Sequence, residues 1–197
     1  PLFFPRSGGA PLPAVLMDNV YETLVRIDED GSITPGLATS WEISDDARSY
    51  TFHLRKGVTF SNGDAFTAET AAFSIDYVRE KWTNGISAAM DPVEKATATD
   101  EHTLKVRLKQ PSNGWLWSRG TATGAMMTPN GMDNLAAQPV GTGPFEVSRF
   151  APSEFVELKV RKNYWGKPAA HDVTVRYFPD TISSVNALQA GGVDVVW

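Results

Sequence analysis

The 197-residue chain contains no cysteine, which excludes disulfide bonds and thiolate metal sites. Many exported proteins also lack cysteine, so this absence leaves the compartment undecided. Long apolar runs are missing as well, because Gly, Pro, Asn and Thr interrupt each stretch before it could cross a bilayer. The first five residues, PLFFP, have neither the charged start nor the apolar run of a secretory signal. If the protein is exported, we expect this to be its processed or trimmed form.

Basic residues are too few to indicate a nucleic-acid partner. Lys and Arg together number 18 against 23 Asp and Glu, the formal net charge is −5, and no dense basic stretch occurs. With 42% hydrophobic and 21% charged residues, the composition is typical of a soluble globular protein. Six tryptophans are many for this length. They could fill a core, the commoner role, or line a ligand cleft.

No catalytic or metal-binding set can be assembled from the sequence. His53, His102 and His171 lie far apart and none has a second ligand type at metal spacing. The acidic run at 28–30 is not a calcium loop, because Thr39 stands where the bidentate acid would be. Residues 141–144 (GTGP) lack the Lys-Ser/Thr of a phosphate loop, and no Gly-x-Ser-x-Gly turn occurs. The sequence therefore predicts no enzyme, no metal and no cofactor.

Hydrophobic periodicity predicts the elements of the first half. Leu16, Val20 and Leu24 are spaced as on one helix face, which predicts a helix over residues 14–24. Residues 24–27 and 32–33 flank Asp-Glu-Asp-Gly, for which a solvated turn is expected. Two strands, at 49–54 and 102–109, follow from strict alternation. Between them we expect a helix that is capped by Thr67 and buries Ala71, Ile75, Val78 and Trp82.

The second half predicts a strand pair and then a crossover. Residues 145–150 and 155–161 alternate as paired strands, and 173–178 is a third strand. Asp180 can cap a helix that runs through Ala190 and ends at Gly191, and an apolar strand would begin at Val193. A strand, a helix and a strand with short joints predict parallel pairing. The last strand would then be central, with its remaining neighbours encoded further along the chain.

Several motifs in order resemble one protein family. They are residues 20–70 (VYETLVRIDEDGSITPGLATSWEISDDARSYTFHLRKGVTFSNGDAFTAET), 141–147 (GTGPFEV), 161–169 (RKNYWGKPA) and the unit that begins DVTVRYFPD at Asp172. Together they resemble the solute-binding proteins of peptide and nickel ABC importers, an extracytoplasmic family known as family 5. The resemblance covers nearly the whole chain from about residue 14. It is specific for the family and much less so for a ligand.

The resemblance implies a mixed α/β (α+β) fold of the periplasmic-binding-protein type II kind, with two lobes around a cleft. Residues 1–41 and 140–197 would form first-lobe segments, and 42–139 an inserted small α/β subdomain. Family members are well over twice this long. The resemblance therefore implies that this is an N-terminal portion, whose last strand would be covered by a missing C-terminal lobe. Without that lobe we expect the chain to bind solute poorly.

The function implied by the resemblance is solute capture. A small peptide or similar solute would be enclosed between closing lobes and delivered to an ABC permease in the membrane, with no nucleic acid involved. The location would be periplasmic or extracytoplasmic, and a lipid anchor before processing is left open. Three alternatives remain. They are a nickel or metal-chelate binding protein of the same family, a cytoplasmic ligand-sensing domain of a transcriptional regulator, and an enzyme or chaperone on the same scaffold.

By resemblance, the cleft wall of this half would come from residues 13–19, 84–90 and 115–127. The predicted ligand-binding residues are Met17, Asn19, Met90, Trp115, Trp117 and Arg119. The two tryptophans could stack on a ligand or anchor the loop to the core, and Arg119 could pair a carboxylate or lie at the surface. Nickel-binding relatives use an arginine in this region, whereas residues 125–127 offer none. This difference favours a peptide.

Overall fold

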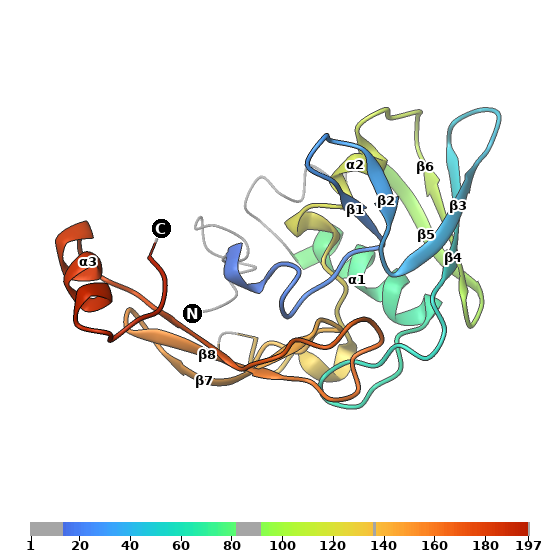
Figure 1. Ribbon diagram of the computed structural model, residues 1–197. Coiled ribbons are helices and arrows are strands. Elements are labelled where there is room, and N and C mark those ends of the chain that lie inside the picture. Colours follow the sequence, from blue (N-terminus) through green and yellow to red (C-terminus); the bar gives the residue numbers. More distant parts are fainter. Residues whose placement is uncertain (1–13, 82–91, 136, 197) are drawn as a thin grey trace.

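The computed structural model of the chain describes residues 14–81, 92–135 and 137–196 (Figure 1). Within these ranges lie three antiparallel sheets. The largest has the strand order β3 (Ala38–Ile43), β4 (Ser49–Leu54), β6 (Thr103–Leu108) and β5 (Val93–Asp100). Helix α1 (Ala68–Lys81) packs against β5 and β6. Together the sheet and the helix make the right-hand part of Figure 1.

The alternating segments form the strands that their pattern predicted. In β4, Tyr50, Phe52 and Leu54 are buried, and in β6 every second residue from Leu104 is buried. Helix α1 buries Ala71, Ile75 and Val78, as its spacing required. The Thr70 amide donates to Thr67 Oγ1 at 3.4 Å, which confirms the cap. Trp82 lies outside the described residues.

The acidic turn and the later strand pair were also predicted correctly. β1 (Val25–Ile27) and β2 (Ile33–Pro35) form a hairpin, whose turn contains Gly31 at a φ of 83°. β7 (Phe145–Ala151), β8 (Phe155–Val160) and β9 (Val173–Arg176) form a three-stranded ribbon. Figure 1 shows this ribbon running away from the four-stranded sheet, with α3 (Thr181–Gln189) at its far end. Asp180 caps α3 by accepting from the Ser183 amide at 2.7 Å.

Two predicted elements do not form. Residues 14–24 contain only the short 3-10 helix η1 (Ala14–Leu16), because Asp18 takes a φ of 63° and the chain then runs extended between neighbouring segments. Residues 193–196 are not a strand, and the expected parallel crossover is therefore absent from the described part of the chain. A strand exists only where its main chain pairs with a neighbour. No described segment forms such a ladder with residues 193–196.

The predicted division into lobe and subdomain can be compared with the strands. The boundary between residues 41 and 42 falls inside β3, whose first residue is Ala38. β4, α1, β5 and β6 lie wholly within residues 42–139. A subdomain beginning at Ala38 would keep β3 intact. The division into first-lobe segments and an inserted subdomain itself stays a prediction.

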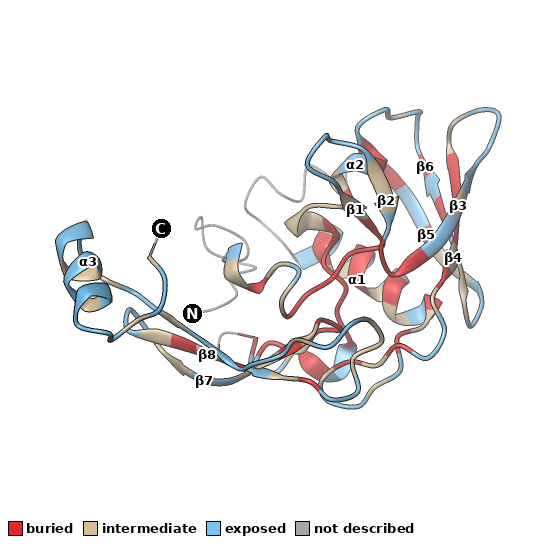
Figure 2. Cartoon of the chain, in the orientation of Figure 1, coloured by how far each residue is buried: buried red, intermediate tan, exposed pale blue. Residues whose placement is uncertain are grey.

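Burial is uneven along the chain, as Figure 2 shows. The core lies between the four-stranded sheet, α1 and the entry segment, by which we mean residues 19–25. Helix α3 has no buried residue, and β9 is mostly exposed. Across the described ranges, no helix combines the length and apolar character needed to cross a membrane.

Candidate functional site

The main chain of the entry segment is hydrogen-bonded on one side to the start of β7 and on the other side to the 115–127 stretch. On one side, the amides of Gly143 and Phe145 donate to Val20 O and Asn19 O, each at 2.9 Å. On the other side, the Met126 amide donates to Glu22 O at 2.9 Å. The segment is therefore paired like a central strand, although it is too irregular to be one. This pairing fixes where the preceding residues, including Met17, can lie.

The glycines of the GTGP motif allow its main chain to lie very close to the main chain of the entry segment. A Cβ atom at Gly141 would lie 1.9 Å from Val20 O, and one at Gly143 would lie 2.4 Å from Asn19 O. Any side chain at these positions would displace the main chain of the entry segment. The motif resembles a phosphate loop in composition, but its physical role is contact between two stretches of backbone.

Glu22 is a buried carboxylate with four donors around it. Oε1 accepts from Tyr164 Oη and Arg26 Nη2, each at 2.8 Å. Oε2 accepts from Trp165 Nε1 at 2.8 Å and from Thr142 Oγ1 at 3.0 Å. Burial, together with the hydrogen bond to Glu22, raises the pKa of Tyr164 to about 12, so the phenol keeps its proton and donates at neutral pH. The carboxylate thus joins the entry segment to the motif at 161–169.

Arg161, at the end of β8, makes a second buried connection. Its guanidinium donates to Gly143 O at 2.9 Å, Gly141 O at 3.2 Å and Thr59 O at 2.8 Å. Burial lowers the pKa of this side chain. A guanidinium has five donors in a rigid fork and can satisfy several carbonyls at once. Arg161 therefore connects the glycine motif by hydrogen bonds to the loop that follows β4.

Met17 lies just before the entry segment, and Asn19 is the first residue of that segment. Both are half-buried. The Asn19 side chain donates from Nδ2 to Val15 O at 3.0 Å, and the Met17 amide donates to Ala14 O at 3.2 Å. The turn is therefore held by its own hydrogen bonds and presents part of each side chain at the surface. Met90 lies outside the described residues, and its predicted role stays a prediction.

The two tryptophans of α2 (Trp115–Ser118) have opposite environments. Trp115 is 2% exposed, and its ring centroid lies 4.9 Å from that of Tyr50 and 6.2 Å from that of Phe52. Trp117 is 48% exposed. Of the two roles that the sequence left open, burial therefore favours core anchoring for Trp115. The exposed indole of Trp117 is accessible to a solute.

Arg119 is fully buried. It donates to Thr123 O and to Thr123 Oγ1, both at 3.1 Å, and to Ser118 Oγ at 2.9 Å. Its guanidinium carbon lies 5.3 Å from the centre of the Trp115 ring. Burial lowers the pKa of Arg119 to about 9, which still leaves the side chain cationic at neutral pH. The surface alternative is wrong, because Arg119 ties α2 to the next turn, η3 (Ala122–Gly124).

The stretch from Trp115 to Met127 lies alongside the entry segment and β1. A Cβ atom at Gly120 would lie 2.7 Å from a side-chain carbon of Ile27, and Thr23 forms an isolated bridge with Ala125. Met126 and Met127 are buried core residues. The structure thus places the described part of one predicted wall segment, 14–19, immediately before and at the start of the paired stretch, and a second segment, 115–127, beside that stretch. The third, 84–90, lies outside the described residues.

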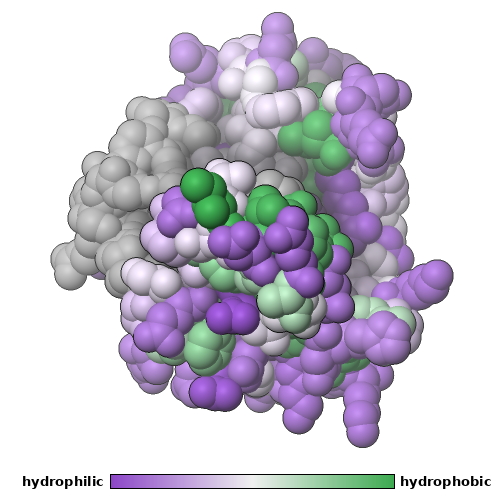
Figure 3. All heavy atoms as spheres, turned by 60° about the vertical axis from the view of Figure 1, so that its left-hand side comes forward, coloured by the Kyte–Doolittle hydropathy of each residue, from purple (hydrophilic) through white to green (hydrophobic). Residues whose placement is uncertain are grey.

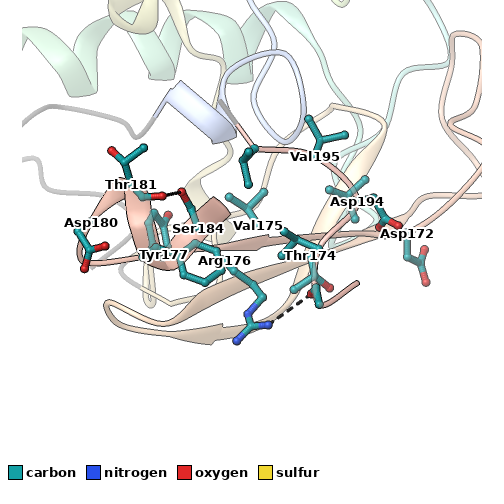
Figure 4. Close-up of a pocket in the computed structure, with 15 residues that line it drawn as sticks. Asp172, Thr174, Val175, Arg176, Tyr177, Asp180, Thr181, Ser184, Asp194 and Val195 are labelled. Carbon is teal, nitrogen blue, oxygen red and sulfur yellow. Dashed lines mark hydrogen bonds between the residues drawn. The ribbon is translucent and has the colours of Figure 1, made fainter. Parts of the chain in front are cut away.

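A hollow of about 1050 Å³ lies elsewhere, between β9, α3 and the tail at 192–196. Figure 4 shows it, and Arg176 Nη1 donates across it to Gly192 O at 3.4 Å. Apolar side chains that line it face solvent, among them Val195 in the tail, which is 68% exposed. In Figure 3, where this end of the molecule comes forward, apolar side chains gather at the surface. Of the predicted ligand-binding residues that the structure describes, none lines this hollow.

No group of three or more His, Cys, Asp or Glu side chains in the described ranges is placed to hold a metal ion. Sequence reasoning missed Glu22 and Arg161 as organising residues. Only their place within motifs of the family resemblance drew attention to them, because burial of a charged side chain has no local sequence signal.

Three comparisons relate the chain to known proteins. The nickel-binding periplasmic protein of Escherichia coli (strain K12) is 32% identical over 191 residues, which cover 90% of this chain and 36% of that protein. A putative ABC transporter peptide-binding protein of Brucella ovis is 31% identical, with the same coverages. The structure of DppA from Helicobacter pylori in complex with peptide STSA matches with a TM-score of 0.77 and 30% identity, over 89% of this chain and 40% of that one.

The chain thus spans well under half the length of each of these relatives, which are binding proteins by name. The periplasmic-binding-protein type of fold and the mixed α/β class are confirmed by the structural match. A family model, described as bacterial extracellular solute-binding proteins, family 5 Middle, matches residues 32–197. The chain belongs to the family 5 extracellular solute-binding proteins of bacteria.

Proposed function

We propose that this chain is part of the solute-binding component of an ABC importer, which captures a small peptide or similar solute outside the cytoplasm and delivers it to a membrane permease. The family match over residues 32–197 is the observation that carries the proposal. In this proposal the protein is periplasmic and has no enzymatic activity, and a lipid anchor before processing is compatible with it. The opposite wall of the cleft would come from a C-terminal lobe.

The wall that this chain contributes would use Met17, Asn19 and Trp117. Each is partly exposed, and they supply a soft apolar group, an amide and an aromatic face, which suit a peptide of mixed polarity. Trp115 and Arg119 would act from behind this surface, the first by anchoring α2 in the core. The buried positive charge of Arg119 would add to the potential felt by a solute carboxylate.

A nickel chelate is the second candidate. It is favoured by the 32% identity to the nickel-binding periplasmic protein, which is as high as the identity to the peptide-binding relative. Overall similarity therefore does not choose between the two solutes. The wall does favour one of them, because an exposed indole and a thioether suit apolar side chains better than a hydrophilic chelate.

The test uses the whole product of the gene, purified without added solute. Mass spectrometry under native and then denaturing conditions should reveal a mass increment that disappears on denaturation and matches a peptide. Calorimetry with the tetrapeptide Ser-Thr-Ser-Ala should then show binding, and W117A should weaken it about tenfold. Binding of Ni²⁺ with L-histidine, in place of the peptide, would support the second candidate. No increment and no binding of either probe would refute the proposal.

The 197-residue chain alone provides the matched comparison. Because it would offer only one wall of the cleft, we expect its affinity for the tetrapeptide to be far below that of the whole product. Micromolar or tighter binding by the isolated chain would overturn this expectation and place the complete site within residues 1–197.

A further inference from the structure

Glu22 occupies the point where four separate parts of the chain meet. Its main-chain oxygen accepts from Met126, and its side chain accepts from Thr142, Tyr164 and Trp165. These partners lie 104 to 143 positions away, by the residue numbers in the sequence. The carboxylate of Glu22 thus connects the glycine motif and the 161–169 motif to the entry segment, and the main chain of the same residue connects the 115–127 stretch.

The carboxylate also accepts hydrogen bonds from four donors, which a neutral amide side chain in its place could not do. Its side chain is 2% exposed and every partner is a donor, including the cationic Arg26. An ionised carboxylate only accepts, whereas an amide would direct two hydrogens at two of these donors. Arg55 stacks on one of these donors, with its guanidinium carbon 4.1 Å from the centre of the Trp165 ring.

We infer that Glu22 is a positioning residue for solute binding: its carboxylate sets the placement of Met17 and Asn19 relative to the 115–127 stretch, without touching the solute. The inference rests on the proposed function for the location of the site. The path is short, because Asn19 O and Val20 O are hydrogen-bonded to the same 141–145 region that Glu22 grips through Thr142. Loss of the carboxylate should therefore allow Met17 and Asn19 to shift relative to the 115–127 stretch.

The test compares Glu22→Gln with Glu42→Gln in the whole product of the gene. Glu42 is a suitable control because its side chain is 75% exposed and contacts only His53 among the ion pairs of the described residues. NMR of the methionine methyl groups reports the surroundings of Met17 and Met126 without any ligand. We expect the Met17 and Met126 methyl resonances to move in E22Q and to stay in place in E42Q. The fluorine resonance of Trp165 in 5-fluorotryptophan-labelled protein, assigned through W165F, should move with them.

Calorimetry with Ser-Thr-Ser-Ala at a temperature where E22Q is still folded by circular dichroism gives the second readout. We expect the affinity of E22Q to fall at least tenfold and that of E42Q to be unchanged. If the methyl resonances stay in place, or if they move and the affinity does not change, the inference is overturned. If the wild type binds no peptide but the methyl resonances move in E22Q, the proposed function fails and the positioning of the wall by Glu22 stands.

Tyr164→Phe covers the case in which E22Q does not fold. It removes one of the four donors to the carboxylate and leaves the charge in place. The same Met17 and Met126 resonances should move by a smaller amount, and the affinity should fall two- to threefold. An unchanged spectrum and an unchanged affinity in Y164F would count against Glu22 as the residue that positions the wall.

Discussion

Replacing Trp115 with alanine should destabilise the protein far more than the same change at Trp117, two positions along α2. Trp115 is 2% exposed and Trp117 is 48% exposed. A buried tryptophan removes roughly 200 Å² from water, which at about 25 cal/mol per Å² corresponds to about 5 kcal/mol. Core substitutions of this size cost about 3–5 kcal/mol in the free energy of unfolding, so we expect that range for W115A.

For W117A we expect about half of that range, about 1.5–2.5 kcal/mol, because half of the side chain is already in water and no closed cavity is left. W115F is the intermediate variant. It keeps a ring against Tyr50 and Phe52, whose centroids lie 4.9 and 6.2 Å away, and it should cost less than W115A.

The assay is urea unfolding followed by far-ultraviolet circular dichroism, because tryptophan fluorescence would change with the substitutions themselves. Equal slopes of stability against urea among the variants would show that the unfolding transition is the same. The reasoning would be refuted if W115A and W117A fell within about 1 kcal/mol of each other, or if W117A were the more damaging. Either result would mean that Trp115 does not anchor α2.

Three further changes test other parts of the structure. Arg161→Met should lower the free energy of unfolding by about 3–5 kcal/mol, because it removes the Arg161 donor from the Gly143 and Thr59 carbonyl groups, whereas Gly141 O keeps the Ser61 amide. The exposed Arg149→Met should cost less than about 0.5 kcal/mol. Urea unfolding at neutral pH compares the two variants, and similar costs would contradict the argument. Gly141→Ala should cost about 3 kcal/mol or more, since its Cβ would lie 1.9 Å from Val20 O, and a thermal midpoint equal to that of the wild type would contradict this contact. Hydrogen bonds from Thr128 and Asn62 hold the pKa of Asp64 below its ordinary value, so its stabilising effect is present above about pH 4 and is lost as the pH falls. Asp64→Asn should therefore flatten the acid side of the stability profile, and an unchanged profile from pH 7 to pH 3 would refute this.

The local sequence pattern was sufficient to predict elements that need only one buried face, whatever residues pack against that face. The alternation in β4 and β6 requires only that one face be buried, and it identified both strands. The spacing of Ala71, Ile75 and Val78, with Thr67 before them, identified α1 for the same reason. The order of motifs was sufficient for the family, because many separate stretches had to match together.

Pattern misled where pairing with distant segments decided the conformation. Leu16, Val20 and Leu24 are all buried, as a helix face would be, but they reach the core from a turn and an extended segment. Hydrogen bonds to Gly143, Phe145 and Met126 hold that segment extended, and helix periodicity contains no information about them. Val193 has the residue type of a strand but no pairing neighbour among the described residues.

The sequence by itself therefore determined the family, through the order of its motifs, and also β4, β6, β7, β8, α1 and α3, through residue type and spacing within a few positions. It did not indicate β3, β5 or α2, whose residues carry no such pattern. The tertiary structure alone decided that Trp115 fills the core while Trp117 faces solvent, and that Arg119 is buried. It also decided that Glu22 joins segments more than a hundred residues apart. The physical reason is that burial and hydrogen bonding of a side chain depend on what the rest of the chain brings beside it.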